Sequence, residues 1–308
     1  VSDGREVLVG AIMEHLEEAG IHSGDSTCFI PPQNVSDDVL KQVDDWTRKI
    51  GLELGIVGCY NIQFAIRDKI LYVLEVNPRG SRTFPFVAKA TGVPLARIAA
   101  MVALGEKLCN LNIPERQDEA VCVKAPVFPF IKLRGLDPAP GPEMKSTGEV
   151  MGSHERASAA YLKARLATES PVPTEGGVYI TVKDSDKDSI IAQAKSLIEL
   201  GFKIYATSGT ASVLREKGGL DIETCYRITE GLTPDALDLM RQGKIQLIIN
   251  TPRNTGGAVL DGNMMRRLAV ELNIPFVTTM AGARMEVLAI AEAMDGIPEP
   301  RLLNIRSL

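Results

Sequence analysis

The feature that most constrains the fold of this chain is the stretch from residue 58 to residue 85, GCYNIQFAIRDKILYVLEVNPRGSRTFP. Apolar and polar residues alternate on both sides of Arg67-Asp68-Lys69, which is the pattern of two half-buried strands joined by a turn. If the hairpin is centred on Lys69, its apolar side pairs Ile62 with Val76, Phe64 with Leu74, and Ile66 with Tyr72. The same register pairs Asn61 with Asn77 and Gln63 with Glu75 on the polar side.

The polar side of this predicted hairpin brings four oxygen-bearing side chains together, because directly opposed residues lie about 5 Å apart at Cβ. Such oxygens suit Mg²⁺, which takes few protein ligands and completes its octahedron with water and nucleotide phosphates. Arg79 and Arg82 follow the second strand, where guanidinium groups are able to hold phosphate oxygens. The alternation by itself fits a solvent-exposed polar face equally well, since any one-sided sheet shows it.

Length and charge describe a globular chain with room for two domains. The 308 residues suffice for two hydrophobic cores, and 24% charged and 45% apolar residues are ordinary shares. A net charge of -5 argues against nucleic acid or an anionic membrane as a general partner. Any phosphate must therefore be held by local basic groups.

The cysteines and the chain start bear on location. The five cysteines show no CxxC or metal-ligand spacing, and we interpret them as reduced thiols of a cytoplasmic protein. No apolar run approaches the roughly 20 residues that span a membrane, and the first residues do not resemble a signal peptide. Because the chain opens on Val1 within a strand-like pattern, we expect it to be part of a longer protein.

The sequence before residue 170 predicts an α+β domain. We expect strands over residues 5–12, 27–30 and 121–124, and helices over residues 14–19, 36–54, 84–108 (with a break near Gly92) and 154–166. Six prolines between residues 111 and 142 indicate a connecting region. We therefore place one domain at residues 1–110 and a segment that completes it at residues 111–169.

From residue 176 onward, strands and helices alternate. We expect strands over residues 178–182, 203–206, 223–228, 246–250 and 275–279, and helices over residues 186–200, 210–217, 234–241, 264–272 and 283–294. This alternation is typical of an α/β fold with a doubly wound parallel sheet, whose ligand crevice lies at the carboxyl ends of the strands. We assign residues 170–308 to this second domain.

The strongest local signal in the second domain is YATSGTA, residues 205–211, where a predicted strand ends in hydroxyl residues and a glycine and a helix begins at once. Backbone N–H groups at a helix N-terminus bind anions, and Gly209 has no Cβ to block a close approach. An ordinary capped turn without any ligand has the same composition, so both interpretations stay open.

GCYNIQFAIRD and LYVLEVNPRGSRTFPFVAKATGVPL resemble the metal-binding strands of an ATP-grasp domain, that of the carbamoyl-phosphate synthase large-subunit family. The resemblance continues through EHLEEAGIHSGDS, GPEMKSTGEVMG and a methylglyoxal-synthase-like domain, and so covers nearly the whole chain. It implies the C-terminal part of the large subunit: the end of the second ATP-grasp module, as a partial α+β domain, followed by a methylglyoxal-synthase-like allosteric domain.

The resemblance implies phosphorylation of carbamate by ATP, giving carbamoyl phosphate on a route from glutamine and bicarbonate to pyrimidines and arginine. It implies ATP and Mg²⁺ or Mn²⁺ as cofactors, with K⁺ as a further candidate. The residues that it carries over are metal ligands (Gln63, Glu75, Asn77), nucleotide contacts (His22, Ser23, Gln63, Glu75) and arginines near the transferred phosphate (Arg79, Arg82).

The implied partners are the remainder of the large subunit, a glutamine amidotransferase small subunit, a nucleotide effector and further copies of the chain. A complete ATP-grasp site also needs a glycine-rich loop, an upstream basic pair, an adenine-binding hinge and a ribose carboxylate. None of these precedes residue 10. We therefore expect no ATP turnover by this chain alone.

In the second domain, the resemblance places the phosphate of a nucleotide effector on residues 205–211. UMP, IMP and PRPP are the effectors of the family, and the sequence does not choose among them. Arg227 stands where some relatives have lysine, which keeps the charge and changes its geometry. The implied effector contacts are Lys187, Thr207, Ser208, Gly209, Thr210, Arg227, Asn250 and Thr251.

Some relatives bind ornithine between the two parts of the chain through several acids and a tyrosine. Glu17, Asp25 and Thr278 match that pattern, whereas Ala125 replaces an expected glutamate and Phe276 an expected tyrosine. Because a carboxylate and a hydroxyl are lost, we expect no activation by ornithine.

Two other classes of function are conceivable for a chain of this kind. A free-standing methylglyoxal synthase has a Gly-Gly-Asp segment after the strand that corresponds to residues 246–250, but here Thr251-Pro252-Arg253-Asn254 follows, without a catalytic aspartate. A binding or oligomerisation module without chemistry remains a valid description of the chain by itself.

Overall fold

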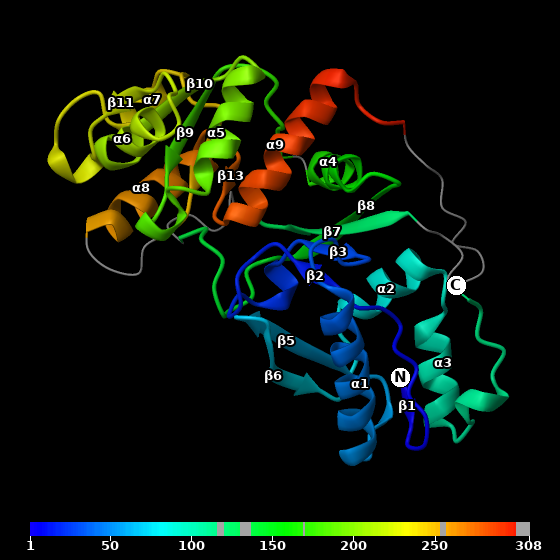
Figure 1. The fold of residues 1–308 in the computed structure, drawn as a ribbon. Helices are drawn as coiled ribbons and strands as arrows, with labels where there is room; N and C mark the ends of the chain where they lie inside the picture. The colour runs from blue at the N-terminus through cyan, green and yellow to red at the C-terminus, as the bar shows by residue number, and fades with distance from the viewer. Residues whose placement is uncertain (116–119, 130–136, 169, 253–256, 300–308) are drawn as a thin grey trace.

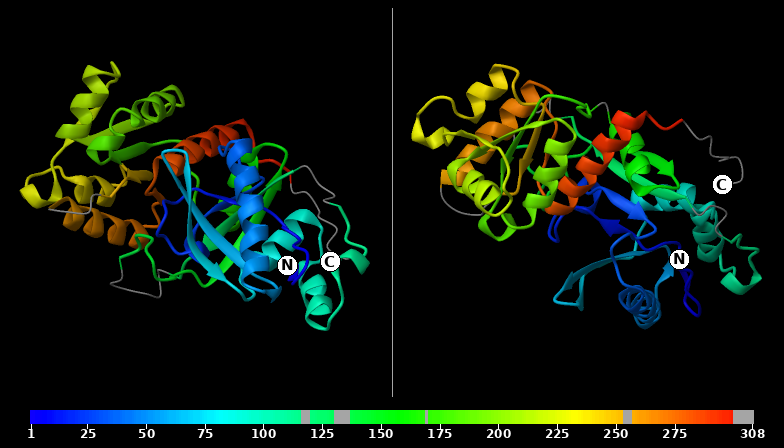
Figure 2. Two further views of the ribbon diagram at one scale, coloured as in Figure 1. Left: turned by 60° about the horizontal axis from the view of Figure 1, so that its bottom comes forward. Right: turned by 45° about the horizontal axis from the view of Figure 1, so that its top comes forward.

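The computed structural model describes residues 1–115, 120–129, 137–168, 170–252 and 257–299 (Figure 1). Two larger sheets organise these residues. A four-stranded antiparallel sheet lies in the first half of the chain, and a five-stranded parallel sheet lies in the second half. The two sheets occupy separate lobes of the molecule in each view of Figure 2.

The antiparallel sheet is the centre of the first half. In spatial order its strands are β2 (Glu14–His15), β3 (Cys28–Ile30), β7 (Val121–Val127) and β8 (Gly148–His154). Helices α2 (Thr83–Thr91) and α3 (Leu95–Ala103) pack on the face that carries Ile30 and Cys122. Helices α4 (Ala157–Ala167) and α9 (Met280–Asp295) pack on the face that carries Phe29 and Val123. Neighbouring residues of a strand thus enter two different cores, as the period of two requires.

Smaller elements complete this half: β1 (Ser2–Asp3) paired with β4 (Val57–Gly58), α1 (Asp37–Glu53), and the short 3₁₀ helices η1 (Ser23–Asp25) and η2 (Leu108–Asn110). The predicted helices over residues 36–54, 84–108 and 154–166 and the strands at 27–30 and 121–124 are confirmed, with ends shifted by a few residues. Within the described ranges, no single helix is long and apolar enough to cross a bilayer, and α2 with α3 pass that test only as a pair bent by 117°.

Two predictions of the type of element are wrong in this half. Residues 5–12 form no strand, and residues 14–19 contain β2 in place of a helix. Glu14 pairs with Phe29, and the Leu16 N–H donates to the Thr27 carbonyl at 3.0 Å, so sheet pairing overrides the local helical pattern.

Strand β8 was missed because its sequence, GEVMGSH, contains two glycines. A Cβ on Gly152 would lie 2.1 Å from the Ala160 carbonyl oxygen of α4. This glycine therefore permits a close approach of helix and sheet, a packing requirement that the local sequence does not show.

The parallel sheet confirms the predicted doubly wound fold. In spatial order its strands are β11 (Glu223–Cys225), β10 (Lys203–Thr207), β9 (Gly177–Thr181), β12 (Leu247–Asn250) and β13 (Phe276–Val277). One face packs on α5 (Ile190–Glu199), α6 (Ser208–Glu216) and α9, and the other on α7 (Ala236–Arg241) and α8 (Gly257–Glu271). Two 3₁₀ helices, η3 (Asp184–Asp186) and η4 (Ile228–Glu230), follow β9 and β11. The chain runs outward from β9 to β11 and then returns to β12, so the strand order reverses between β9 and β12. Ligand crevices of such sheets lie at this point.

The two halves meet where α4 and α9 lie side by side above β7 and β8 (Figure 1). Glu286 of α9 is fully buried there. Its carboxylate accepts a hydrogen bond from the Tyr161 hydroxyl at 2.8 Å and lies 3.2 Å from Arg165 Nε. A buried charge is tolerated only when it is paired in this way, so these contacts fix the position of α9 on α4.

Candidate nucleotide and effector sites

The hairpin of β5 (Asn61–Arg67) and β6 (Ile70–Asn77) carries the polar patch that the sequence predicts. Its register pairs Asn61 with Asn77 and Gln63 with Glu75, as predicted. Directly opposed residues point to the same face of an antiparallel pair. The Asn77 amide donates to Glu75 Oε1 at 2.9 Å and to Asn61 Oδ1 at 3.3 Å. The amide and carboxylate oxygens therefore share one face of the hairpin.

Toward the turn, the predicted register is wrong by one residue. Asp68 and Lys69 both have positive φ values, 53° and 64°, which is the geometry of a two-residue hairpin turn. The predicted turn was Arg67-Asp68-Lys69. The shorter turn is compensated by a β-bulge next to Gln63, where β6 has one extra residue. Beyond the bulge the pairs are Phe64 with Val73, Ala65 with Tyr72, and Ile66 with Leu71.

The bulge changes which apolar residues are covered. The predicted partners Leu74 and Tyr72 are 47% and 45% exposed, whereas Leu71 is 4% exposed. Ile66 is also exposed. The continuous apolar side that the sequence predicts for the hairpin is thus interrupted on the turn side of the bulge.

A cavity of about 580 Å³ lies between the hairpin and the segment that leads into β2. Gln63 and Ser23 line it, together with apolar residues such as Met13, Phe64 and Val87. Small-molecule sites typically measure about 300–1,000 Å³ and are largely apolar with a few polar groups. The cavity is therefore of a size for a nucleotide-sized ligand beside the polar patch.

The loop around η1 holds the two predicted nucleotide contacts, His22 and Ser23. His22 Nδ1 accepts a hydrogen bond from the Gly24 N–H at 3.0 Å, so this ring nitrogen caps η1. The Ser23 carbonyl accepts from Lys124 Nζ at 2.9 Å, and Lys124 is fully buried. The buried ammonium group of Lys124, on β7, therefore fixes the position of this loop.

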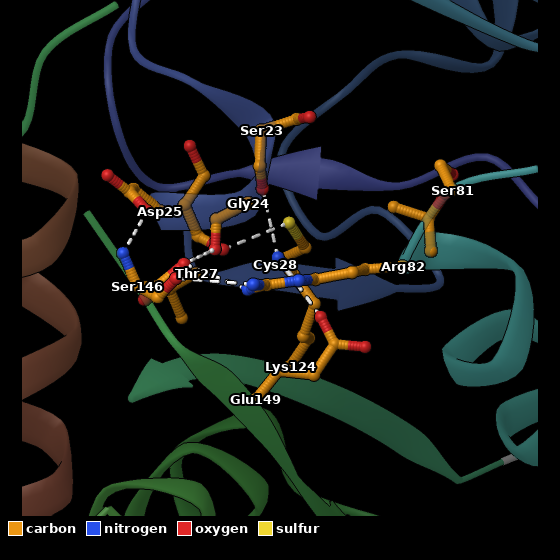
Figure 3. A network of polar contacts seen from close by, with 12 residues as sticks. Ser23, Gly24, Asp25, Thr27, Cys28, Ser81, Arg82, Lys124, Ser146 and Glu149 are labelled. Atoms are coloured by element: carbon orange, nitrogen blue, oxygen red, sulfur yellow. Dashed lines mark hydrogen bonds and ion pairs between the residues drawn. The ribbon is translucent and has the colours of Figure 1, made fainter. Parts of the chain in front are cut away.

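The two predicted phosphate-binding arginines take different positions. Arg79 is exposed and lies next to the polar patch, with its guanidinium 3.4 Å from Asn77 Oδ1. Arg82 donates to Ser146 Oγ at 3.1 Å and to the Ser146 carbonyl at 3.2 Å (Figure 3). Ser146 in turn donates to the Gly24 carbonyl at 2.9 Å. Arg82 is thus brought to the loop around η1, while Arg79 stays beside the polar patch of the hairpin.

Burial shapes the electrostatics beneath this loop. Desolvation raises the pKa of Glu17 to about 7, although the Thr27 N–H donates to its carboxylate at 2.7 Å. Desolvation also lowers the pKa of His15 to about 4, with the Lys124 ammonium acting in the same direction. The pKa of the Cys28 thiol rises to about 12 for the same reason, so this cysteine is an inert thiol.

A second pocket lies at the carboxyl ends of β9 and β12, where the strand order reverses. Seven of the eight predicted effector residues line it: Lys187, Thr207, Gly209, Thr210, Arg227, Asn250 and Thr251. Ser208 is exposed and lies outside the lining. Sequence reasoning missed Thr181, which ends β9, and Asp261 of α8, which lies within a helical pattern that gives no sign of a site.

The geometry of this pocket suits a small anionic group. Its volume is about 50 Å³, well below the roughly 300 Å³ of a pocket for a whole small molecule. Thr207, the residue before α6, makes no capping bond with its side chain, so N–H groups of the first turn remain for a ligand. Lys187 Nζ would lie 3.3 Å from a Cβ on Gly209, so the glycine allows the ammonium close to the helix start.

A third cavity, of about 460 Å³, lies between the two halves. Glu17 and Thr278 line it, but Asp25, Ala125 and Phe276 do not. Both Asp25 carboxylate oxygens accept backbone N–H groups, at 2.8 and 2.9 Å. Two of the five positions of the ornithine pattern therefore face this cavity. Arg253 and Asn254, named in the methylglyoxal-synthase comparison, lie outside the described residues.

The hairpin patch supplies only some of the oxygen ligands that a divalent cation requires. Within the residues that the structure covers, no group of three or more His, Cys, Asp or Glu side chains is arranged to hold a metal ion. The hairpin patch offers one carboxylate, Glu75, and amide oxygens. That set fits Mg²⁺ or Mn²⁺ bound together with nucleotide phosphates, and it does not fit a cation enclosed by protein ligands alone.

Two family models match the chain. Residues 2–111 match the carbamoyl-phosphate synthase L chain, ATP binding domain, and residues 189–278 match the MGS-like domain. The chain is 50% identical to the carbamoyl phosphate synthase large chain of Methanothermobacter thermautotrophicus over 298 residues, which is 96% of this chain and 28% of that protein. It is 47% identical to the large chain, C-terminal section, of Methanocaldococcus jannaschii over 307 residues, 96% of this chain and 49% of that protein. The chain therefore spans less than half the length of these relatives.

Proposed function

Because this chain belongs to the carbamoyl phosphate synthase large-chain family and corresponds to its C-terminal part, we propose that it supplies one wall of an ATP site that phosphorylates carbamate, together with a domain that binds a nucleotide effector. The single observation that carries the first role is the hairpin register. Gln63 lies opposite Glu75, and Asn77 donates to Glu75, on one face of β5 and β6.

In this proposal, Gln63, Glu75 and Asn77 hold Mg²⁺ or Mn²⁺. The cation would neutralise charge on the ATP phosphates during transfer to carbamate. Arg79 adds positive charge beside the patch, and Arg82 orients the loop around η1, which we call the nucleotide loop, through Ser146. Transfer of a phosphoryl group asks mainly for positioning and charge neutralisation, and the residues named here supply both.

The same proposal gives roles to the nucleotide loop and to the three parts of the chain. The nucleotide loop, His22 and Ser23, contacts ATP, and K⁺ is a further candidate cation. Residues 1–110 form the ATP-grasp lobe, residues 111–169 complete it by supplying β7 and β8 to the antiparallel sheet, and residues 170–308 form the allosteric domain.

We propose a cytoplasmic enzyme, a glutamine-hydrolysing ligase of the ATP-grasp type. Its proposed partners are a glutamine amidotransferase subunit, the remainder of the large chain and further copies of itself. Its product serves pyrimidine and arginine synthesis.

The second role rests on the pocket between β9 and β12. Lys187, Thr207 and Thr210 surround the start of α6, where a phosphate is stabilised by N–H groups and a nearby ammonium. Because the pocket is too small for a whole nucleotide, the rest of the effector would lie along the exposed rim of the pocket, at Arg227. For UMP or IMP this part is the nucleoside, and for PRPP it is the remaining groups. Ornithine is not expected to act, because Ala125 and Phe276 remove two of its partners.

The catalytic proposal is tested in the full-length large chain with Glu75→Gln. This change keeps the shape of the side chain and removes the one carboxylate of the patch. We expect carbamate-dependent ATP consumption to fall by at least about 100-fold, since charge neutralisation at the phosphates is weakened. Glu53→Gln is the matched control, because Glu53 is an exposed carboxylate at the end of α1. Activity of Glu75→Gln within about threefold of the control would contradict the proposal.

A further inference from the structure

A buried arginine joins the effector pocket to the first half of the chain. Arg266 of α8 is 3% exposed. Its Nη2 and Nε lie 2.8 and 3.0 Å from the two carboxylate oxygens of Asp137, and its Nη1 donates to Asn250 Oδ1 at 2.8 Å. A planar guanidinium holds a carboxylate with two parallel hydrogen bonds, so the relative position of the two groups is tightly specified.

The first end of this connection is part of the effector pocket. Asn250 lines that pocket, and its amide donates to the Thr181 carbonyl at 3.3 Å. Arg266 itself is not in the pocket lining. A Cβ on Gly262 would lie 2.8 Å from Arg266 Nη1, so the glycine leaves room for the guanidinium beside Asn250.

The second end is a compact segment, residues 137–146, which we call the connecting strap. Its ends are drawn together by Lys145, whose Nζ donates to the carbonyls of Asp137 and Ala139 at 3.0 and 2.5 Å. The Ala139 N–H donates to the Asp137 carboxylate at 3.0 Å. Movement of Asp137 is therefore passed on to Lys145 and to the residue that follows it.

The strap ends on the nucleotide loop (Figure 3). The N–H groups of Lys145 and Ser146 donate to the two carboxylate oxygens of Asp25, at 2.8 and 2.9 Å. Asp25 is 1% exposed and belongs to η1, directly after Ser23 and Gly24. Ser146 also receives both hydrogen bonds of Arg82. One segment thus contacts the effector-side arginine and the nucleotide loop.

We propose that Arg266 and Asp137 are positioning residues that couple the effector pocket to the nucleotide loop through the connecting strap. The inference rests on the proposed effector function and extends it. A phosphate bound beside Asn250 offers the Asn250 amide N–H groups a charged acceptor, which binds more strongly than the neutral Thr181 carbonyl. A shift of the Asn250 amide moves the Oδ1 atom that accepts from Arg266 Nη1, and with it the guanidinium that holds Asp137. Effector occupancy then favours one arrangement of the strap, and the strap in turn biases the effector pocket.

Amide hydrogen exchange of this chain, with and without saturating UMP or IMP, tests the coupling. Two peptides report: one covering residues 205–211 at the pocket, and one covering residues 137–146 in the strap. In the wild type we expect protection of the pocket peptide and at least a twofold change in exchange of the strap peptide. In Arg266→Lys, which keeps the charge and loses the fork, we expect the pocket to stay protected and the strap response to vanish.

Asp137→Asn changes the other side of the same contact, and we expect it to abolish the strap response as well. The double variant should reduce the strap response no more than either single variant does. Arg241→Lys is the matched control, because Arg241 is exposed at the end of α7. A strap response that persists in both variants, or pocket protection without a strap response in the wild type, overturns the inference. If neither nucleotide protects the pocket peptide of the wild type, the effector function itself fails, and the coupling fails with it.

Discussion

Two titrating side chains beneath the nucleotide loop have opposite effects on stability. Burial raises the pKa of Glu17 to about 7, so the folded chain binds this proton more tightly than the unfolded chain, whose value is near 4.5. Acidification from pH 7 to 4.5 is therefore stabilising through Glu17. Burial lowers the pKa of His15 from 6.5 to about 4, so the unfolded chain binds this proton more tightly than the folded chain. Acidification from pH 6.5 to 4 is therefore destabilising through His15.

Between pH 4.5 and 6.5 the two contributions oppose each other, and Glu17→Gln removes one of them. On acidification across this range we expect the free energy of unfolding of this variant to fall more steeply than that of the wild type. The expected difference in slope is about 1.4 kcal/mol per pH unit. Urea unfolding at several pH values measures it. Glu6→Gln, at an exposed position, should follow the wild type, and identical pH dependence of Glu17→Gln and wild type would refute the account.

Individual residues were predictable from the sequence where one strong local rule applied. Thr207, Gly209 and Thr210 sit at a junction of strand and helix, and the structure does place them around a pocket. The contact between Arg266 and Asp137 spans 129 residues. No local pattern relates residues so distant, because their proximity depends on how the two halves pack.

At the scale of elements, the β5–β6 hairpin shows how a turn decides a register. The polar pairs at its far end agree with the sequence-based register, but the turn at Asp68 and Lys69 is one residue shorter than predicted. Two-residue turns usually place glycine at the second position. Because Lys69 stands at the second position in place of glycine, the sequence did not indicate a two-residue turn. Without that turn, the alternation of the strands gave no reason to expect the bulge.

The register makes a prediction about stability. Leu71→Ala should lower the free energy of unfolding by about 2–5 kcal/mol, because Leu71 is 4% exposed. Leu74→Ala, the matched control on the same strand, should change it by less than about 0.5 kcal/mol, because Leu74 is 47% exposed. Denaturant unfolding of the two variants provides the comparison. A larger loss for Leu74→Ala would support the register without a bulge.

The other elements were predictable where local sequence decides the structure and were missed where a non-local contact decides it. The doubly wound sheet follows from the alternation of strands and helices, which reports a buried parallel sheet directly. The helix predicted at residues 14–19 failed because Glu14 and His15 pair with β3. Strand pairing of this kind is a non-local contact that overrides a short helical pattern.

In the chain as a whole, the two candidate sites lie in different halves that are joined by buried polar contacts. Glu286 with Tyr161 and Arg165 fixes α9 on α4, and Arg266 with Asp137 connects α8 to the connecting strap. Displacing one partner of a buried ion pair leaves the other charge buried and uncompensated, which is strongly destabilising. The chain is therefore suited to transmit a change in one half to the other.

We propose above that Gln63 and Glu75 share a divalent cation that binds the ATP phosphates. The most direct measurement is anomalous scattering from Mn²⁺ in crystals of the full-length large chain with a non-hydrolysable ATP analogue. We expect a Mn²⁺ peak between the side-chain oxygens of Gln63 and Glu75 and the analogue's phosphates. A Mn²⁺ ion held with the phosphates by other residues, and no peak at the hairpin, would contradict it.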